Sequence, residues 1–212
     1  MCGPVQHRGF KELEDKLLGA LFLLVSLPVM GIAALLIKLT SPGPVIFVQK
    51  RHGLYGKRIR VYKFRTMHGP RLRRQARAHA FHQRSPAAAR WRGSPPGVTP
   101  VGWMLRVTSI DELPQLFNVI KGDMSLVGPR PHPVRLNLQY MSAVDRLAWR
   151  HCVKPGITGL AQISGARGPI RTAEDMQRRV EYDLEYIRKW SPMLDLKIIG
   201  LTFLKGIINR QS

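Results

Sequence analysis

Acidic residues are missing from a long part of this sequence. Between Asp15 and Asp111, none of 95 consecutive residues is Asp or Glu, while the same stretch holds 17 Lys and Arg. Over the whole chain of 212 residues, 34 basic and 13 acidic residues give a formal net charge of +21. Such a charge indicates anionic partners, which could be nucleic acid, phosphorylated small molecules or an acidic membrane surface.

Cysteine is also scarce, because Cys2 and Cys152 are the only two in the sequence. Two cysteines cannot build a disulfide framework or a zinc site, so we expect each to be an inert thiol. Aromatic residues make up 8% of the chain, but hydrophobic residues make up 44%, which excludes a fully disordered protein. The length suits one domain with an appendage rather than two large enzyme domains.

One stretch lacks charge of either sign. Residues 17–37 are 21 residues without a charged side chain, and as a helix they would be about 32 Å long, enough for the hydrocarbon core of a bilayer. Ser26 and Pro28 interrupt the centre, and we expect a kink there because proline removes a backbone donor. The run predicts membrane attachment, with a wholly buried soluble helix as the less favoured alternative. Composition leaves open whether the helix spans the bilayer or turns back.

The next segment predicts extended structure. Residues 45–49 and 59–64 read as two short strands that form a β-hairpin. Lys63 and Arg65, in the sequence YKFRTM, stand where the second strand ends, and they form either a solvated strand end or a phosphate clamp. Residues 68–97 contain no acid and have neither helical nor strand periodicity. We interpret them as a mobile basic loop suited to anionic lipid headgroups.

Residues 106–131, RVTSIDELPQLFNVIKGDMSLVGPRP, are the most informative segment. Ser109 and Glu112 fit the capping-box pattern S-x-x-E at the start of a helix that stops at Gly122, which favours a structural role for Glu112. Asp111 would lie in the first turn of that helix, where the macrodipole favours an ionised carboxylate.

The same segment suggests a site for anions. Arg106 precedes the predicted helix start, whose free N–H groups can bind a phosphate, and Arg130 lies in a turn restrained by two prolines. An ionised Asp111 beside a phosphate is a candidate nucleophile for phosphoryl transfer or a magnesium ligand. Because a carboxylate and a phosphate repel each other, a divalent cation is expected if the two are to meet.

The remaining chain carries three helical patterns. Residues 134–149 predict an amphipathic helix, and residues 172–190 predict a charged surface helix. Residues 193–208 place apolar residues beside lysines and an arginine, which suits an interfacial helix and a core helix equally.

Together these motifs resemble the bacterial sugar transferase family. The resemblance rests on the apolar N-terminal helix, GPV-F-Q-R-GLYGK, YKFRTM, the segment 106–131, KPGITGLAQISG and DLEYIRKWSPMLDLKII. The family comprises small monotopic phosphoglycosyltransferases that attach a hexose-1-phosphate to polyprenyl phosphate. The later motifs are most similar to members that begin exopolysaccharide, capsule or lipopolysaccharide repeat units.

The resemblance implies an α+β fold in two parts. Residues 1–40 would form a kinked, re-entrant membrane helix broken at Ser26 and Pro28. Residues 41–212 would form a small, mostly helical catalytic domain with a short β-hairpin, the basic loop 68–97 and interfacial amphipathic helices. Both ends of the membrane helix, and the active site, would lie on the cytosolic face of the bacterial inner membrane.

The resemblance also implies the chemistry. Asp111 would attack the sugar-bearing phosphorus of a UDP-sugar, expel UMP and form a covalent phosphosugar–aspartyl intermediate, which polyprenyl phosphate would then attack. Glu112 would complete an Asp–Glu dyad, and Mg²⁺ would bind near Asp111. The residues expected to hold substrate phosphates or the substrate itself are Lys63, Arg65, Arg106 and Arg130.

The implied partners are a UDP-sugar donor, a polyprenyl phosphate acceptor and membrane lipids. A homodimer is allowed, and no nucleic acid is expected. Two alternatives use the same features differently: a membrane-tethered protein that binds nucleic acid through residues 68–97, or an inactive relative that scaffolds polysaccharide assembly. The first alternative explains the charge but leaves the DELPQL and GPRP motifs without a role.

The segment before Val101 departs from the family pattern. The usual D-P-R-x-T stands here as PPGVT, over residues 95–99. Either the loop has diverged, or two compensating reading-frame errors in the gene replaced residues 68–97. The intact mass of the protein from its native organism distinguishes the two, because agreement with 24.0 kDa excludes the frame errors.

Overall fold

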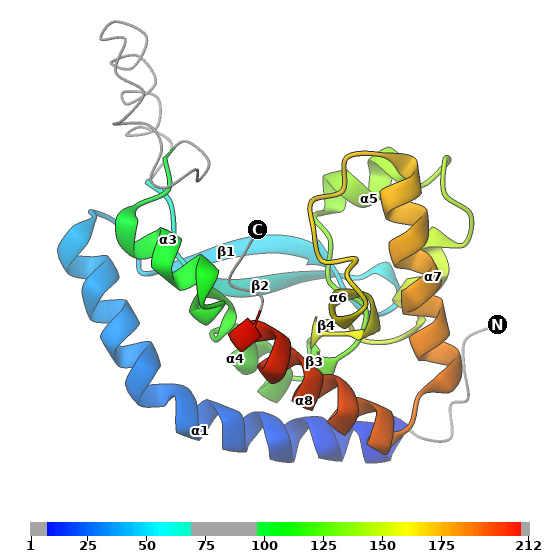
Figure 1. The fold of residues 1–212 in the computed structure, drawn as a ribbon, viewed down its shortest axis with the longest axis horizontal. Coiled ribbons are helices and arrows are strands. Elements are labelled where there is room, and N and C mark those ends of the chain that lie inside the picture. The colour runs from blue at the N-terminus through cyan, green and yellow to red at the C-terminus, as the bar shows by residue number, and fades with distance from the viewer. Residues whose placement is uncertain (1–7, 69–96, 209–212) are drawn as a thin grey trace, which may run out of the picture. The chain divides into compact units, whose positions relative to one another are not determined.

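The computed structural model describes residues 8–68 and 97–208, which Figure 1 shows as a coloured ribbon. These ranges form helices and two two-stranded sheets, which confirms a mixed α+β architecture. The basic loop predicted over residues 68–97 lies outside the described residues except at its two ends, so that interpretation stays a prediction.

The N-terminal apolar run belongs to a single helix, α1 (Arg8–Thr40), of 33 residues. The helix continues through Pro28, and the Ser26 hydroxyl donates to Met30 Sδ at 3.6 Å. Among the described helices it is the one long and apolar enough to cross a membrane, and 17% of its most apolar window is buried. A core helix would be mostly buried, so this exposure argues against the soluble alternative. The kink and the re-entrant path stay predictions.

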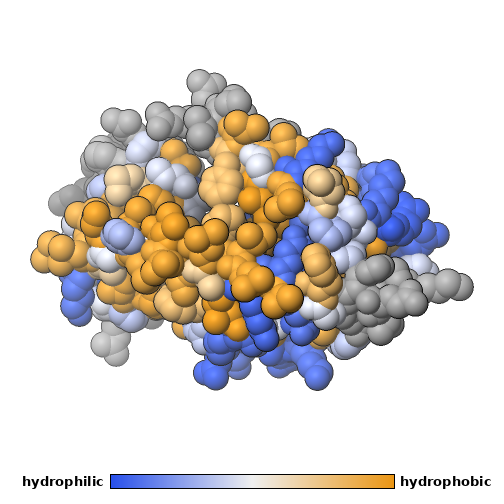
Figure 2. All heavy atoms as spheres, turned by 90° about the horizontal axis from the view of Figure 1, so that it is seen from below, coloured by the Kyte–Doolittle hydropathy of each residue, from blue (hydrophilic) through white to orange (hydrophobic). Residues whose placement is uncertain are grey.

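Leucines along α1 show how exposed its apolar surface is. Leu17, Leu24 and Leu39 are 63%, 67% and 73% exposed. Figure 2, seen from below the view of Figure 1, shows apolar side chains in orange gathered over this helix. Hydrating apolar surface costs roughly 25 cal/mol per Å² relative to an apolar environment, so α1 fits a membrane-associated protein.

The predicted hairpin is confirmed. β1 (Ile46–His52) pairs with β2 (Arg58–Phe64) in a two-stranded sheet, although β1 extends beyond the predicted end at residue 49. The turn between them contains the short 3-10 segment η2 (Leu54–Gly56). The backbone N–H of Gly53 donates to the carbonyl oxygen of Lys57 at 2.7 Å and closes the turn.

Helix α3 (Pro100–Val107) leads to the predicted catalytic segment. Thr99 caps it by accepting a hydrogen bond from the N–H of Gly102 at 2.8 Å, and proline occupies the first helical position. A Cβ on Gly102 would collide with the backbone carbonyl of Thr66. The glycine therefore lets α3 lie directly against the chain that leaves β2.

The predicted capping box is wrong. Ser109 has a left-handed backbone with φ +59° and makes no capping hydrogen bond. Asp111 and Glu112 belong instead to a 3-10 turn, η4 (Ile110–Glu112). Asp111 is therefore not in the first turn of an α-helix, and the macrodipole argument for its ionisation no longer applies.

Helix α4 (Gln115–Ile120) is shorter than predicted. Pro114 precedes it, where the missing N–H costs no helical hydrogen bond. The chain leaves the helix at Gly122, which adopts φ +80° as expected for a C-terminal glycine. Leu116 is buried as predicted, whereas Phe117 of the predicted apolar face is 42% exposed.

A second sheet forms between chain segments distant in sequence. β3 (Ser125–Val127) and β4 (Gly156–Thr158) are parallel, with Ser125 opposite Gly156, and β4 leads into α6 (Leu160–Ile163). A Cβ on Gly156 would collide with the backbone nitrogen of Gly128. The glycine of KPGITG thus allows β4 to lie close to the turn that follows β3.

Two of the three C-terminal helical patterns are confirmed. The charged pattern is α7 (Ala173–Lys189), which begins with a capping box between Thr172 and Asp175. The last pattern is α8 (Pro192–Ile208). This helix has features of both a core helix and an interfacial helix, because Ile198 is fully buried while Phe203 is 60% exposed.

The helix predicted over residues 134–149 is too long. α5 (Val134–Tyr140) is followed by turns and by the 3-10 segment η5 (Leu147–Cys152), with Arg146 at φ +60° between them. The break in the helix lets Val144 join the core formed with α7. Cys152 is disulfide-bonded, so the expectation of an inert thiol there is also wrong.

The described chain divides into two compact units. The first unit contains the residues up to Leu24, Val48–Val61 and the chain from Gln115 onward, and the second contains Val25–Phe47 and Tyr62–Pro114. The domain limit predicted at residue 40, where the membrane helix would end, stays a prediction.

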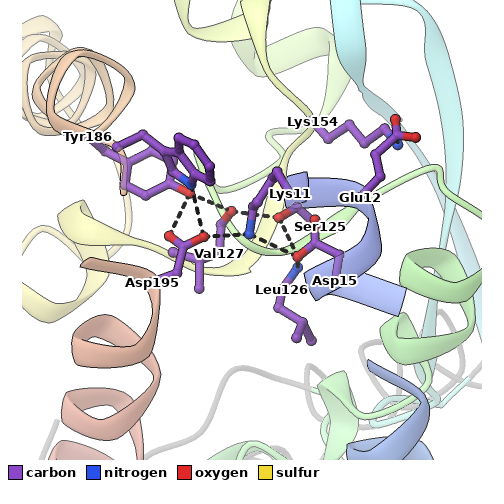
Figure 3. A network of polar contacts seen from close by, with 10 residues as sticks. Lys11, Glu12, Asp15, Ser125, Leu126, Val127, Lys154, Tyr186 and Asp195 are labelled. Carbon is purple, nitrogen blue, oxygen red and sulfur yellow. Dashed lines mark hydrogen bonds and ion pairs between the residues drawn. The ribbon is translucent and has the colours of Figure 1, made fainter. Parts of the chain in front are cut away.

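A buried polar network holds the start of α1 within the first unit, as Figure 3 shows. Lys11 Nζ lies 2.9 Å from Asp15 Oδ1 and 2.6 Å from Asp195 Oδ2. Asp15 Oδ1 also accepts hydrogen bonds from the Ser125 hydroxyl and from the N–H of Leu126, both at 3.0 Å. One carboxylate thus joins α1 to β3.

The second carboxylate of this network is fully buried. Asp195 accepts hydrogen bonds from the Tyr186 hydroxyl at 2.8 Å and from the Trp190 indole N–H at 3.0 Å. With Lys11 it has three partners, which offset the cost of removing a charge from water. Helices α1, α7 and α8 therefore meet at one carboxylate.

Replacement of Asp195 by alanine should destabilise the protein by about 3 kcal/mol, because it leaves Lys11 with one fewer counter-charge and removes the buried acceptor of the Tyr186 and Trp190 hydrogen bonds. The thermal unfolding midpoint, followed by tryptophan fluorescence in detergent, should fall clearly. Glu185→Ala removes the exposed ion pair with Lys189 and is the matched control, with an expected loss under about 0.5 kcal/mol. Equal shifts for the two variants would contradict this role of Asp195.

Candidate functional site

An ion pair joins two of the predicted site motifs within the second unit. Lys63, near the end of β2, places Nζ 2.6 Å from Oε1 of Glu112 in η4. Both side chains are partly buried, at 20% and 12% exposure. YKFRTM and IDELPQL, far apart in the sequence, therefore meet at this contact.

Asp111 occupies the middle of η4, directly before Glu112, and is half-buried. The left-handed Ser109 directs the chain out of α3 and into this turn. The N–H of Glu112 donates to the Ser109 carbonyl at 3.1 Å, which holds the tight turn. Two adjacent carboxylates repel each other, and the ammonium of Lys63 compensates one of them.

Arg106 and Arg65 differ in what they contact. Arg106, in the last turn of α3, donates from Nε to Thr66 Oγ1 at 2.9 Å, and so lies beside YKFRTM. Arg65 is buried and donates to the backbone carbonyls of Ser41 and Pro42 at 2.7 and 2.6 Å. The structure thus gives Arg65 a bracing contact with the end of α1, and substrate binding by this residue stays a prediction.

The side chains around Asp111 determine whether this site could bind magnesium. In the part of the chain that the structure describes, no group of three or more His, Cys, Asp and Glu side chains is placed to hold a metal ion. Magnesium is often held by one or two carboxylates together with substrate phosphates and water. Asp111 can supply such a carboxylate, so the residues fit a metal that arrives with a phosphorylated substrate.

Arg130 lies in the first unit, on the turn that follows β3. The backbone carbonyl of Pro129 accepts from the N–H of Gly156 at 3.0 Å. The carbonyl of Arg130 itself accepts from Arg150 Nη2 at 2.7 Å, and that of Pro131 accepts from Arg51 Nη1 at 2.6 Å. Three successive carbonyls are thus bonded by three separate elements.

A buried cluster lies behind this turn. Arg150 is 1% exposed and forms an ion pair with Asp183 at 2.6 Å. Its Nη1 lies 2.7 Å from His132 Nδ1, and Arg179 Nη1 lies 3.2 Å from the Nε2 of the same ring. Burial, followed by the charges of Arg150 and Arg179, holds the pKa of His132 well below its usual range. The imidazole is therefore neutral.

The electrostatics of this cluster favour positive charge in the arginines and none in the histidines. Burial and the nearby Arg150 lower the pKa of Arg179 to about 10, which still leaves it protonated at neutral pH. Burial, Arg150 and His52 lower the pKa of His151 to about 4. Asn137 Nδ2 lies 3.2 Å from His151 Nε2, a contact that requires the neutral ring to accept.

Sequence reasoning selected Arg130 but missed the residues that hold its turn. A signal for Arg51 was present, because it is the arginine of GPV-F-Q-R-GLYGK, whereas Arg150 lies in no motif that separates it from other basic residues. Asp183 offered a signal, because it shares the buried face of α7 with Met176 and Val180. A carboxylate on an apolar helix face indicates a buried cation.

The chain has clear relatives. The family model described as bacterial sugar transferase matches residues 6–209. A UDP-glucose:undecaprenyl-phosphate glucose-1-phosphate transferase of Escherichia coli (strain K12) is 48% identical over 97% of this chain and 42% of the relative. The protein of that name from Klebsiella pneumoniae is 49% identical over 96% of this chain and 41% of its own length.

A relative with another donor in its name is also similar. The UDP-N-acetylgalactosamine-undecaprenyl-phosphate N-acetylgalactosaminephosphotransferase of Aeromonas hydrophila is 40% identical over 82% of this chain and 38% of its own length. The chain spans about two fifths of the length of these three curated relatives.

The low pKa of His151 predicts a loss of stability in acid. Between the ordinary pKa of 6.5 and the folded value of about 4, the unfolded chain binds more protons than the folded one, so stability falls as the pH falls through this window. The contribution of this residue is at most about 3 kcal/mol and is reduced by solvent screening. Urea unfolding at pH 7 and pH 4.5 should show a smaller acid loss for His151→Gln than for wild type. An unchanged difference would contradict the assignment.

Proposed function

The chain belongs to the bacterial sugar transferase family, and from this premise we propose that it transfers a hexose-1-phosphate from a UDP-sugar to polyprenyl phosphate and releases UMP. We propose UDP-glucose as the donor and undecaprenyl phosphate as the acceptor, since the relatives from Escherichia coli and Klebsiella pneumoniae carry both in their names. The observation that carries the proposal is the Lys63–Glu112 ion pair, which brings two family motifs together beside Asp111.

The proposed reaction has two displacement steps. A carboxylate oxygen of Asp111 attacks the phosphorus that bears the sugar, the bond from this phosphorus to the bridging oxygen of the diphosphate breaks, and UMP leaves with that oxygen. An oxygen of polyprenyl phosphate then attacks the same phosphorus, and the Asp111 carboxylate leaves unchanged. The product is the polyprenyl diphosphate sugar, and the enzyme is regenerated.

The neighbouring residues support these steps through charge. Lys63 neutralises Glu112, so that the dyad presents one net negative charge rather than two to an anionic substrate. Arg106, held beside Thr66, and Arg130 are proposed to bind phosphate oxygens. Mg²⁺ is proposed to bind at Asp111 and the diphosphate, where it would reduce the repulsion between carboxylate and phosphate.

The proposed membrane arrangement rests on the apolar surface of α1. We propose that the helix is re-entrant, with its break at Ser26 and Pro28, so that both ends lie on the cytosolic face of the inner membrane. The exposed apolar surface of α1 supports contact with lipid. An active site at the membrane surface could receive a water-soluble nucleotide sugar and a lipid phosphate together. We place the reaction at the first membrane step of exopolysaccharide, capsule or O-antigen-type assembly.

Asp111→Asn should abolish UMP release, because the amide is not a competent nucleophile. The assay contains the full chain in detergent, Mg²⁺, undecaprenyl phosphate and UDP-glucose, with UDP-N-acetylgalactosamine as a second donor. Asp145→Asn, which alters an exposed carboxylate of the same kind, is the matched control and should retain wild-type activity. Without acceptor, intact mass spectrometry should find wild-type protein with one added hexose phosphate. Equal turnover by wild type and Asp111→Asn would refute the proposed nucleophile.

Pro28→Ala should convert a re-entrant helix into a spanning one, because a straight helix across the apolar run is long enough to cross the bilayer. Single cysteines at positions 10 and 40, in a background with Cys2 and Cys152 replaced by serine, report the side of each end through an impermeant thiol reagent. Both should react from the cytosolic side in wild type and from opposite sides in Pro28→Ala. Pro42→Ala, beyond the helix end, is the control. Labelling of the wild-type ends from opposite sides would exclude re-entry.

A further inference from the structure

Arginine side chains from two other elements bind the backbone of the turn that contains Arg130. The carbonyl of Arg130 accepts from Arg150 at 2.7 Å, and the next carbonyl, of Pro131, accepts from Arg51 at 2.6 Å. Hydrogen bonds from ionised donors are stronger than those between neutral groups. Two guanidinium groups therefore donate hydrogen bonds to adjacent carbonyls of one short turn.

Arg150 is placed by its own partners before it reaches the turn. Asp183 Oδ2 accepts from its Nε at 2.9 Å and lies 2.6 Å from its Nη2. The same Nη2 donates to the Arg130 carbonyl. With both side chains nearly inaccessible, at 1% and 2% exposure, Arg150 cannot turn away without leaving a buried carboxylate unpaired. The position of α7 is thereby transmitted to the backbone of Arg130.

Arg51 approaches the turn from the hairpin. Its Nε and Nη2 both donate to Gln49 Oε1, which orients the guanidinium and leaves Nη1 directed at the Pro131 carbonyl. An isolated antiparallel bridge between Arg51 and Pro133 adds a backbone restraint beside this contact. The hairpin thus restrains the turn independently of α7.

We infer that Arg51 and Arg150 are positioning residues for Arg130: they fix the backbone from which its guanidinium binds a phosphate of the nucleotide sugar. The inference rests on the phosphate-binding role proposed for Arg130. A long side chain reaches the same place each time only if its Cα is fixed, and a small displacement of a binding group can cost a large factor in affinity or rate. Neither residue itself needs to touch the substrate.

A double-mutant cycle tests the inference. The full chain in detergent carries Asp111→Asn to prevent turnover, and calorimetry measures the dissociation constant for UDP-glucose. Arg130→Ala, Arg150→Lys and Arg51→Met should each weaken binding about tenfold. In the Arg130→Ala background, Arg150→Lys and Arg51→Met should have almost no further effect, because a group that is absent cannot be misplaced.

Arg179→Lys is the matched control. Arg179 belongs to the same buried cluster, but its described hydrogen bonds reach the His132 ring and the Gly168 carbonyl, not the carbonyls of Arg130 and Pro131. It should change the dissociation constant less than about twofold. Thermal unfolding shows which variants are folded. Arg51→Met serves if Arg150→Lys does not fold, because Arg51 is only partly buried and its described hydrogen bonds reach Gln49 and the Pro131 carbonyl.

The outcomes are distinct. Losses by Arg51→Met or Arg150→Lys that persist in full without Arg130 would overturn the inference, and so would unchanged binding by Arg130→Ala. The binding cycle does not require turnover. If wild-type protein releases no UMP but the cycle is non-additive, the positioning roles stand and the proposed transferase reaction fails.

Discussion

Removing a charged side chain from water costs several kcal/mol unless a partner compensates, and the first compact unit depends on how this cost is met. Asp195 and Asp183 are both almost fully buried, and each is paired with a basic residue from a distant part of the chain. Lys11 brings the start of α1 to α8, and Arg150 brings η5 to α7. Separating either carboxylate from its partner would leave a buried charge unpaired. These elements are therefore fixed in position against one another.

This constraint connects stability to the proposed chemistry. Arg150 satisfies Asp183 and the carbonyl of Arg130 with one guanidinium, so the contact that buries a charge also shapes a turn proposed to bind phosphate. In the second unit, the partly buried Lys63 pairs with Glu112, next to the proposed nucleophile Asp111. A protein with a net charge of +21 has few carboxylates, and several of them, such as Asp183, Asp195 and Glu112, pair with specific arginines and lysines.

Several elements were predictable because their signals are local. The apolar run of α1, the hairpin with its glycine turn and the charged pattern of α7 each depend on residues close in sequence. The capping box at Ser109 failed although its pattern was equally good. The helix begins only after Pro114, and the residues before the proline form a 3-10 turn instead. Residues 134–149 failed for a tertiary reason, because Val144 and Leu147 pack into a core with α7 that a continuous helix would not form.

The sequence by itself determined the family, the apolar helix and the identity of the candidate residues, because composition and motifs are properties of the chain alone. Tertiary structure decided which of those residues meet. Lys63 and Glu112 are 49 positions apart, and only the packing of β2 with η4 brings an ammonium to that carboxylate. The tertiary structure also showed that Arg65 braces backbone carbonyls and that Arg51 and Arg150 hold the turn of Arg130. A sequence motif records a residue type, but a charge acts over a few ångströms, and that distance exists only in the folded protein.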